Sequence, residues 1–299
     1  MDVNMSSTTE KIQHIELEIL SEFKRICEKY SLQYFAIGGT CIGAIRHQGF
    51  IPWDDDIDIA MPLKDYKKFV EIAKSELREP YLIYTPEEHR LYQFNFVKIH
   101  DANTFYIRKN YAPYPDRYTG VFFDVMPIYG MGKTKIEQSI NSVMCDLWLY
   151  RNKAIRLPYD FYPSTAVWNY IWHTTRLFAG KKQFNYYIEK MEAKLGKYPF
   201  PNSDKVMFGW RKRPSIFRKK YKYKNVFYYE DFAESIEVPF ENTTIRVPKG
   251  YDRYLRMDFG DYMQLPPENQ RSSSHQRNCV LDLENSYKLY QSGALKINL

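Results

Sequence analysis

The segment 53–59 reads Trp-Asp-Asp-Asp-Ile-Asp-Ile, so it places four aspartates at the start of an apolar run. As an extended strand with a side-chain period of two, it would send Asp54, Asp56 and Asp58 to one face, with Asp55 facing away from them. Carboxylates one step apart on a strand face repel each other unless a cation lies among them. Oxygen ligands of this kind suit Mg²⁺ or the similar Mn²⁺. The segment therefore predicts a metal-binding strand that enters a core.

A calcium-binding loop and a solvated acidic turn are the alternative interpretations of this segment. An EF-hand loop that began at Asp54 would need Gly at its sixth position and Glu at its twelfth, where this chain has Ile59 and Asp65. A surface turn would not usually lead straight into the apolar residues 59–61. The carboxylate-bearing strand therefore explains the pattern better.

The length and the cysteines favour a large intracellular protein. With 299 residues the chain can bury a substantial core, as one large domain or two closely joined ones. Its four cysteines are scattered without metal-binding spacing, which fits reduced thiols. The N-terminal residues are polar, and no apolar stretch is long enough to span a bilayer. We therefore expect a soluble, cytoplasmic protein without a structural disulfide.

The net charge of +7 is concentrated in two basic runs, 211–213 and 218–224. Such runs are usually solvated faces, and their functional interpretation is an anionic partner. A helix-turn-helix, zinc-finger or RNP-type signature does not accompany them, so a membrane surface or acidic glycan is favoured over nucleic acid. We expect peripheral contact with an anionic membrane at its inner face and no nucleic-acid partner.

Hydrophobic periodicity predicts an α/β (α+β) fold, with helices around one mixed sheet. A helix opens after the capping box 7–10 and ends near residue 30, and further helices are expected at 40–47 and 63–77. The expected strands are 34–37, 54–59, 81–84, 94–100, 104–107 and 121–126, with a late hairpin over 236–248.

The chain divides into three parts on this pattern. Residues 1–130 are expected to form the core that carries the acidic segment, and residues 131–230 a helical, basic insertion that is rich in aromatic residues. Residues 231–299 carry the hairpin and a tail that complete the catalytic domain. Neither a repeat nor a low-complexity linker separates the parts, so we expect them to pack together.

A glycine pair precedes the acidic segment and gives it a phosphate-binding partner. Gly38 and Gly39 allow close backbone approach, and N–H groups at the start of the following helix, which Thr40 would cap, form an anion site. The later Asp56-Ile57-Asp58 adds a metal site to this cradle. Nucleotidyltransferase-fold enzymes use this arrangement.

The sequence around these residues resembles the LicD family of bacterial phosphocholine transferases, whose relatives include the animal fukutin-related ribitol-phosphate transferases. Residues 35–59 carry most of the resemblance. Residues 121–127, Val-Phe-Phe-Asp-Val-Met-Pro, agree as well, and so does the tail 260–267 with Arg271 and His275 beyond it.

The resemblance implies a Mg²⁺-dependent transferase on a nucleotidyltransferase-type fold. It would move a phospho-alcohol group from a CDP-linked donor to a hydroxyl of a cell-surface glycan or glycolipid, and release CMP. CDP-choline is the favoured donor, and a polyol donor such as CDP-ribitol or CDP-glycerol is the alternative. The acceptor stays open among lipopolysaccharide, teichoic acid, capsule and a glycolipid precursor.

The acidic residues can carry this chemistry. Asp56 and Asp58 would hold the cation against the pyrophosphate, and Asp124 would be the third carboxylate, as a metal ligand or a general base. Asp54 has the right strand parity to be a further ligand.

Basic residues would bind the phosphates. Arg46 suits bidentate contact, although a salt bridge to Asp54 or Asp55 is the alternative. The other predicted phosphate contacts are Lys98, Arg271 and His275.

Two rival hypotheses keep the same fold. The first is a true nucleotidyltransferase, which attacks the α-phosphorus of a nucleoside triphosphate and releases pyrophosphate. The second is a non-catalytic protein that binds a glycan or a membrane.

Overall fold

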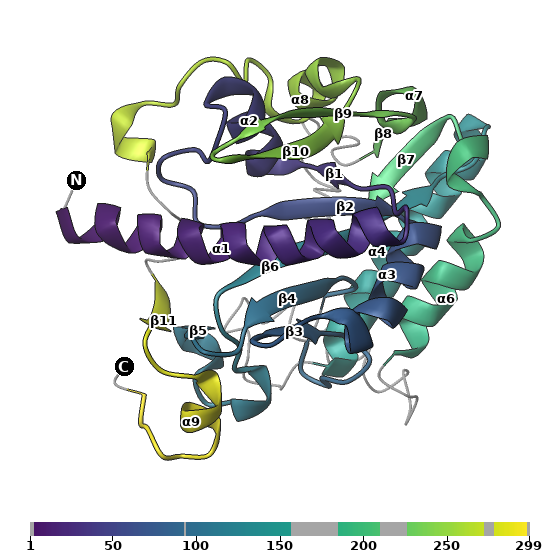
Figure 1. Cartoon of the computed structure of the whole chain (residues 1–299). Helices are drawn as coiled ribbons and strands as arrows, with labels where there is room; N and C mark the ends of the chain where they lie inside the picture. The colour runs from purple at the N-terminus through teal and green to yellow at the C-terminus, as the bar shows by residue number, and fades with distance from the viewer. Residues whose placement is uncertain (1–2, 93, 157–184, 210–225, 272–277, 298–299) are drawn as a thin grey trace.

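A computed structural model of the chain describes residues 3–92, 94–156, 185–209, 226–271 and 278–297 (Figure 1). Its helices are α1 (Val3–Lys29), α2 (Gly38–Arg46), α3 (Leu63–Glu76), α4 (Lys135–Arg156), α6 (Tyr186–Leu195), α7 (Tyr229–Phe232), α8 (Tyr251–Phe259) and α9 (Tyr287–Gln291). Its strands are β1 (Phe35–Ala36), β2 (Asp58–Pro62), β3 (Tyr81–Tyr84), β4 (Val97–Asp101), β5 (Phe105–Arg108), β6 (Phe122–Gly130), β7 (Lys205–Phe208), β8 (Val226–Tyr228), β9 (Ser235–Phe240), β10 (Thr243–Pro248) and β11 (Cys279–Asp282). The expected α/β class is confirmed.

A mixed sheet forms the centre of the molecule. Its strands follow the order β1-β2-β6-β4-β3, and β7 pairs with both β6 and β8. β2 runs parallel to β6, whereas the other neighbours are antiparallel. The two central strands therefore begin at the same end of the sheet, at the left in Figure 1.

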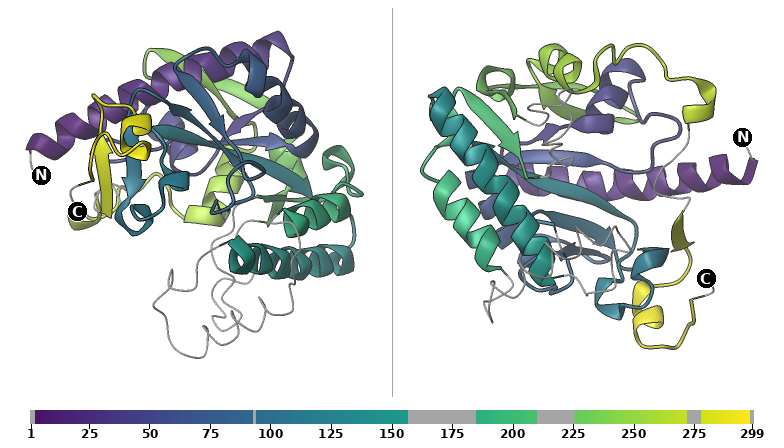
Figure 2. Two further views of the ribbon diagram at one scale, coloured as in Figure 1. Left: turned by 90° about the horizontal axis from the view of Figure 1, so that it is seen from below. Right: turned by 180° about the vertical axis from the view of Figure 1, so that it is seen from behind.

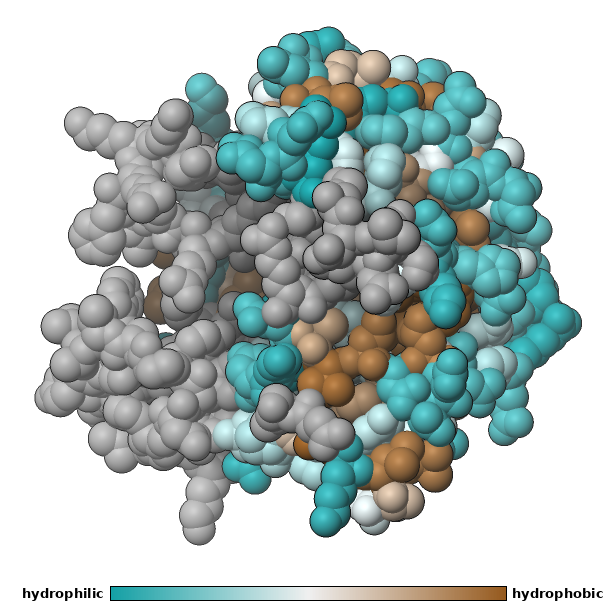
Figure 3. Space-filling model, turned by 90° about the vertical axis from the view of Figure 1, so that its left-hand side faces the viewer, coloured by the Kyte–Doolittle hydropathy of each residue, from teal (hydrophilic) through white to brown (hydrophobic). Residues whose placement is uncertain are grey.

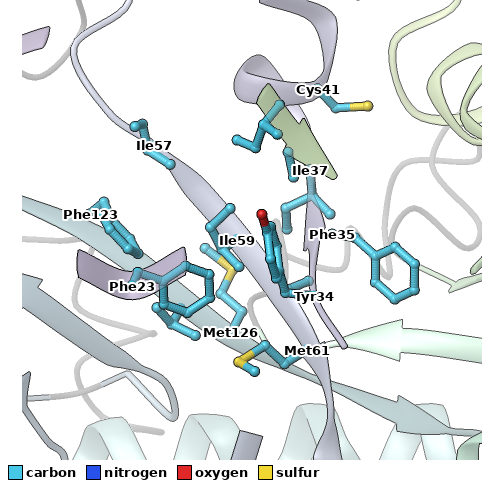
Figure 4. Packing of buried hydrophobic residues seen from close by; sticks show 14 of the residues in the cluster. Phe23, Tyr34, Phe35, Ile37, Cys41, Ile57, Ile59, Met61, Phe123 and Met126 are labelled. Atoms are coloured by element: carbon cyan, nitrogen blue, oxygen red, sulfur yellow. The ribbon is translucent and has the colours of Figure 1, made fainter. Parts of the chain in front are cut away.

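Helices cover both faces of this sheet. α1 lies in front of β2 and β6 in Figure 1, and α4 and α6 lie on the opposite side, as both views of Figure 2 show. Phe23 of α1 makes edge contacts with Phe69 of α3 and with Phe123 of β6, at ring-centroid distances of 5.0 and 5.4 Å. In Figure 4, Ile59 lies beside the rings of Phe23 and Phe123. The sheet face toward α1 is thus apolar around the start of β2.

α1 begins earlier than the sequence predicted. The helix already includes Val3, so the expected capping box at 7–10 lies inside it rather than at its start. Among the described residues, no helix combines the length and the apolar character needed to cross a membrane.

The segment 131–230 contains strands as well as helices. Its last part returns to the main sheet, where β7 pairs with the C-terminal half of β6 and β8 pairs with β7. The Met131 N–H donates to the Lys205 carbonyl at 2.9 Å, so the chain leaves the sheet and re-enters it at neighbouring points. The segment is therefore continuous with the core, and the three-part division of the chain stays a prediction.

The C-terminal part packs back onto the N-terminal part. β9 and β10 form the expected hairpin. The ring of Phe240 packs on that of Phe50, with 5.0 Å between the ring centroids. β11 pairs with β5 in an antiparallel ladder. Residues from both ends of the chain consequently surround the start of β2.

Candidate active site

Three charged side chains lie side by side across three neighbouring strands. Asp58 of β2 pairs in register with Asp124 of β6, and Asp124 pairs with Lys98 of β4. Cross-strand partners share a sheet face, and this face is the one opposite Phe123, since successive side chains alternate. Lys98 Nζ forms a salt bridge with Asp124 Oδ1, and the two side chains are only 12% and 15% exposed. The sheet thus brings together three of the residues that the sequence predicted.

This row of charges lies in a poorly hydrated environment. Burial, followed by the charges of Asp56 and Asp124, raises the pKa of Asp58 well above its usual range. Burial also lowers the pKa of Lys98, and the charge of Asp124 opposes that effect. Lys98 Nζ lies 3.3 Å from the centroid of the Phe122 ring, which adds a cation–π contact. Lys98 therefore offsets part of the negative charge at this end of the sheet.

The acidic segment itself is a loop, and the prediction of a strand from Asp54 is wrong. β2 begins only at Asp58, because a turn that joins the Asp54 N–H to the Ile51 carbonyl at 2.8 Å precedes it. One carboxylate oxygen from each of Asp54, Asp55 and Asp56 lies within 4.8 Å of the others. Asp55 is buried and belongs to this cluster, so the expectation that it faces away is also wrong. Strand alternation does not apply where the backbone turns.

Glu16 of α1 is a further carboxylate that the sequence analysis missed. Its side chain is 0% exposed, and neither carboxylate oxygen has a hydrogen-bond partner within the described part of the chain. Burial, and then the charges of the Asp54–Asp56 loop, raise the pKa of Glu16 well above its usual range. Glu16 lies four residues after Ile12 and three before Ile19, on the buried stripe of the helix. This position on the apolar stripe was the feature of the sequence that could have identified Glu16 as a buried carboxylate.

The glycine pair makes room for carboxylates. α2 begins at Gly38, which has a φ of +58°. An added methyl group would lie 3.2 Å from Asp58 Oδ2 at Gly38, and 2.3 Å from Asp54 Oδ2 at Gly39. The Gly38 N–H donates to the Tyr254 hydroxyl at 2.8 Å. The positive end of the α2 dipole therefore faces the two aspartates, and phosphate binding by the glycines stays a prediction.

Thr40 has a different position from the one expected. It lies inside α2 rather than at its N-cap, and its Oγ1 accepts the Asp58 N–H at 2.8 Å. This hydrogen bond fixes the first residue of β2 against the helix.

The predicted basic residues are distributed around the acidic loop. Arg46 donates to the Tyr262 carbonyl and, at 3.4 Å, to the Gln264 carbonyl, so it holds the C-terminal segment against α2. The Arg271 guanidinium lies 5.6 Å from the ring of Trp53, directly before the loop. His275 lies outside the described residues.

The carboxylates fit a hard divalent cation. Asp54, Asp56, Asp58 and Asp124 supply the oxygen donors that Mg²⁺ or Mn²⁺ prefers, and both oxygens of the buried Glu16 carboxyl group lack a hydrogen-bond partner among the described residues. The site lies toward the side of the molecule seen in Figure 3, where hydrophilic and apolar side chains adjoin. The roles of these residues as ligands stay predictions.

A mixed α/β sheet with carboxylates on adjacent parallel strands, next to a glycine-led helix, defines a nucleotidyltransferase-type fold. Residues 31–169 match the family model described as LicD/FKTN/FKRP, nucleotidyltransferase domain. The chain is also 31% identical over 281 residues to the lipopolysaccharide cholinephosphotransferase LicD of Haemophilus influenzae, and the match covers 90% of this chain and 96% of that protein. The chain belongs to the LicD family.

Two further relatives share shorter parts of the sequence. An uncharacterised protein of Rickettsia typhi is 28% identical over 120 residues, which are 40% of this chain and 38% of that protein. One from Rickettsia prowazekii is 38% identical over 48 residues, which are 16% and 18% of the two chains. Family membership confirms the expected resemblance and the phosphotransferase class.

Proposed function

We propose that this protein transfers phosphocholine from CDP-choline to a hydroxyl of a cell-surface glycan or glycolipid, and releases CMP in a Mg²⁺-dependent reaction. The observation that carries the proposal is the likeness to the Haemophilus cholinephosphotransferase over 96% of that protein's length. By the same likeness, lipopolysaccharide is the acceptor that we favour. The acidic site supports it, because phosphoryl transfer depends chiefly on positioning and on neutralising charge.

The residues of the site have distinct parts in this reaction. Bound Mg²⁺ would neutralise charge on the donor pyrophosphate, held by Asp56, Asp58 and Asp124 with Asp54 as a further ligand. The acceptor oxygen would attack the distal phosphorus and the bond to CMP would break; if Asp124 acts as a general base instead of a cation ligand, it would accept the hydroxyl proton. Lys98, beside Asp124, would present an ammonium group to the transferred phosphoryl group.

The experiment is a donor panel with two product assays. The protein and Mg²⁺ are incubated with CDP-choline, CDP-ribitol, CDP-glycerol or CTP, with and without lipopolysaccharide, and CMP and pyrophosphate are measured. We expect CMP from CDP-choline, increased by the acceptor and abolished by chelation. Asp58→Asn should abolish release with an unchanged circular dichroism spectrum. Glu230→Gln is the matched control, because Glu230 is 79% exposed and pairs with Arg253 away from the site.

The other products identify the rival hypotheses. CMP from a polyol donor alone would make the protein a polyol-phosphate transferase, and pyrophosphate from CTP would make it a nucleotidyltransferase. If the protein neither turns over nor binds a CDP-linked donor by calorimetry, a non-catalytic binding role replaces the proposal. Full activity of Asp58→Asn would contradict the assigned site.

We also propose peripheral contact with an anionic membrane, made through α4. Four large apolar side chains lie on one stripe of this helix, with exposed fractions of 73%, 52%, 60% and 47% at Ile136, Ile140, Val143 and Leu147. Exposed Lys133 and Lys135 lie at the start of the stripe and complement anionic headgroups. The basic runs at 211–213 and 218–224 lie outside the described residues. A cytoplasmic location stays a prediction.

Vesicle sedimentation tests this contact. The wild type should sediment with phosphatidylglycerol vesicles and less so at high salt, and Ile140→Glu should weaken the binding. Leu289→Glu is the control, since Leu289 is 39% exposed on α9, away from α4. Equal sedimentation of the two variants would contradict the proposed surface.

A further inference from the structure

Glu16 has a buried carboxylate whose negative charge no described hydrogen-bond donor compensates. Its side chain is fully buried, and both oxygens lack a hydrogen-bond partner among the described residues. A buried carboxylate without a donor is costly unless it is protonated or a cation lies beside it.

The face of α1 that carries Glu16 packs against the Asp54–Asp56 loop. The Gln13 side-chain amide donates to the Asp54 carbonyl at 2.8 Å, and Glu16 lies three residues further along the same face of the helix. The loop carboxylates also contribute to the raised pKa of Glu16. Glu16 is therefore buried beside a loop in which three carboxylates already lie within 4.8 Å of one another.

This group is separate from the Asp58–Asp124 pair. Glu16 comes from α1, which packs on the Phe123 side of the sheet, whereas Asp124 is the next residue along β6 and lies on the opposite face. The loop joins the two sides, because it runs from its contact with Gln13 to the first residue of β2.

We propose that Glu16 and the buried Asp55 hold a second divalent cation, which shares the Asp54 and Asp56 carboxylates with the ion proposed at Asp56, Asp58 and Asp124. The inference rests on the proposed function and deepens it, because a cation beside the fully buried Glu16 would offset the negative charge of the loop whose carboxylates hold the catalytic ion. Because every ligand at this second position would be a carboxylate oxygen, we expect Mg²⁺ or Mn²⁺ there rather than a softer metal. Glu16 is a positioning residue for the cation in this scheme and does not touch the reacting atoms.

Mn²⁺ binding to the substrate-free protein tests the proposal, with the free ion counted by electron paramagnetic resonance. The wild type should bind two ions. Glu16→Gln, which keeps the shape and removes the charge, should weaken one of them by about 10- to 100-fold. Asp55→Asn should weaken the same ion, and Asp58→Asn should weaken the other. Glu22→Gln is the control, because Glu22 is a buried carboxylate of the same helix that pairs with Arg25 instead.

The change in melting temperature on addition of Mn²⁺ separates the cation role from a protonated, structural Glu16. If Glu16 binds a cation, Mn²⁺ should raise the melting temperature of Glu16→Gln less than that of the wild type. Wild-type stoichiometry, affinity and thermal shift in Glu16→Gln would overturn the proposal, and so would a wild type that binds one ion or none. CMP release is measured separately, so failure of the transferase assay leaves this result readable.

Discussion

Replacing Lys98 with methionine tests whether the ammonium group holds the two strand aspartates together. Asp58 and Asp124 are register partners on parallel strands. The side chains of Lys98 and Asp124 are only 12% and 15% exposed, so removing the ammonium group leaves Asp124 buried without its counter-charge. Removing one partner of a buried ion pair costs about 3–5 kcal/mol in other proteins. We therefore expect Lys98→Met to lower the free energy of unfolding by about 3 kcal/mol.

Urea unfolding followed by circular dichroism, at pH 7 without divalent cations, measures this cost. Lys67→Met is the matched control: its salt bridge to Glu192 has a similar geometry, but Lys67 is 55% exposed, so the expected loss is below about 1 kcal/mol. Adding Mg²⁺ should restore part of the stability of Lys98→Met, because a cation replaces the lost charge. Adding Asp124→Asn to that variant should also restore it. Equal, small losses in both lysine variants would refute the reasoning.

Further predictions concern the glycine turn, the strand start and acid stability. Gly39→Ala places a methyl group 2.3 Å from Asp54 Oδ2, so we expect weaker Mn²⁺ binding and a loss of about 1–3 kcal/mol in calorimetry and urea unfolding; unchanged values would contradict this contact. Thr40→Val leaves the Asp58 N–H without its acceptor and should cost about 1–3 kcal/mol, whereas Thr40→Ser should retain stability. Burial lowers the pKa of His100 to about 3, so the unfolded chain takes up a proton first as the pH falls below the ordinary histidine value. Stability should fall by about 2 kcal/mol between pH 7 and pH 5 from this residue, and His100→Gln should flatten that slope in pH-dependent unfolding.

The sequence could predict the apolar strands that deliver Asp58 and Asp124, because each aspartate lies in an apolar stretch. Their direct pairing depends on the register between β2 and β6, which residues far apart in the chain determine. The salt bridge to Lys98 depends on the next register, between β6 and β4. Local patterns therefore identified the residues, and sheet assembly decided which of them touch.

The two errors at the acidic segment have the same physical origin. An alternating Asp-Ile pattern suggested a strand from Asp54, but the turn after Ile51 is held by Gln13, a residue of α1 that is remote in sequence. Glu16 was missed because a single acidic residue on an amphipathic helix is ordinarily solvated. Its burial follows from how α1 crosses the sheet, which periodicity alone does not determine.

The segment between β6 and β7 leaves the sheet and returns to it at neighbouring residues, and this arrangement has a consequence for how such enzymes diversify. Met131 and Lys205 are joined by a backbone hydrogen bond, and Asp204 and Gly132 are joined by another at 3.3 Å. The two ends of the segment are therefore adjacent, at the end of β6 that is remote from Asp124. A relative's segment could be exchanged between these positions without interrupting the sheet. Such chimaeras would replace the segment while the sheet that carries Asp58, Asp124 and Lys98 stays intact.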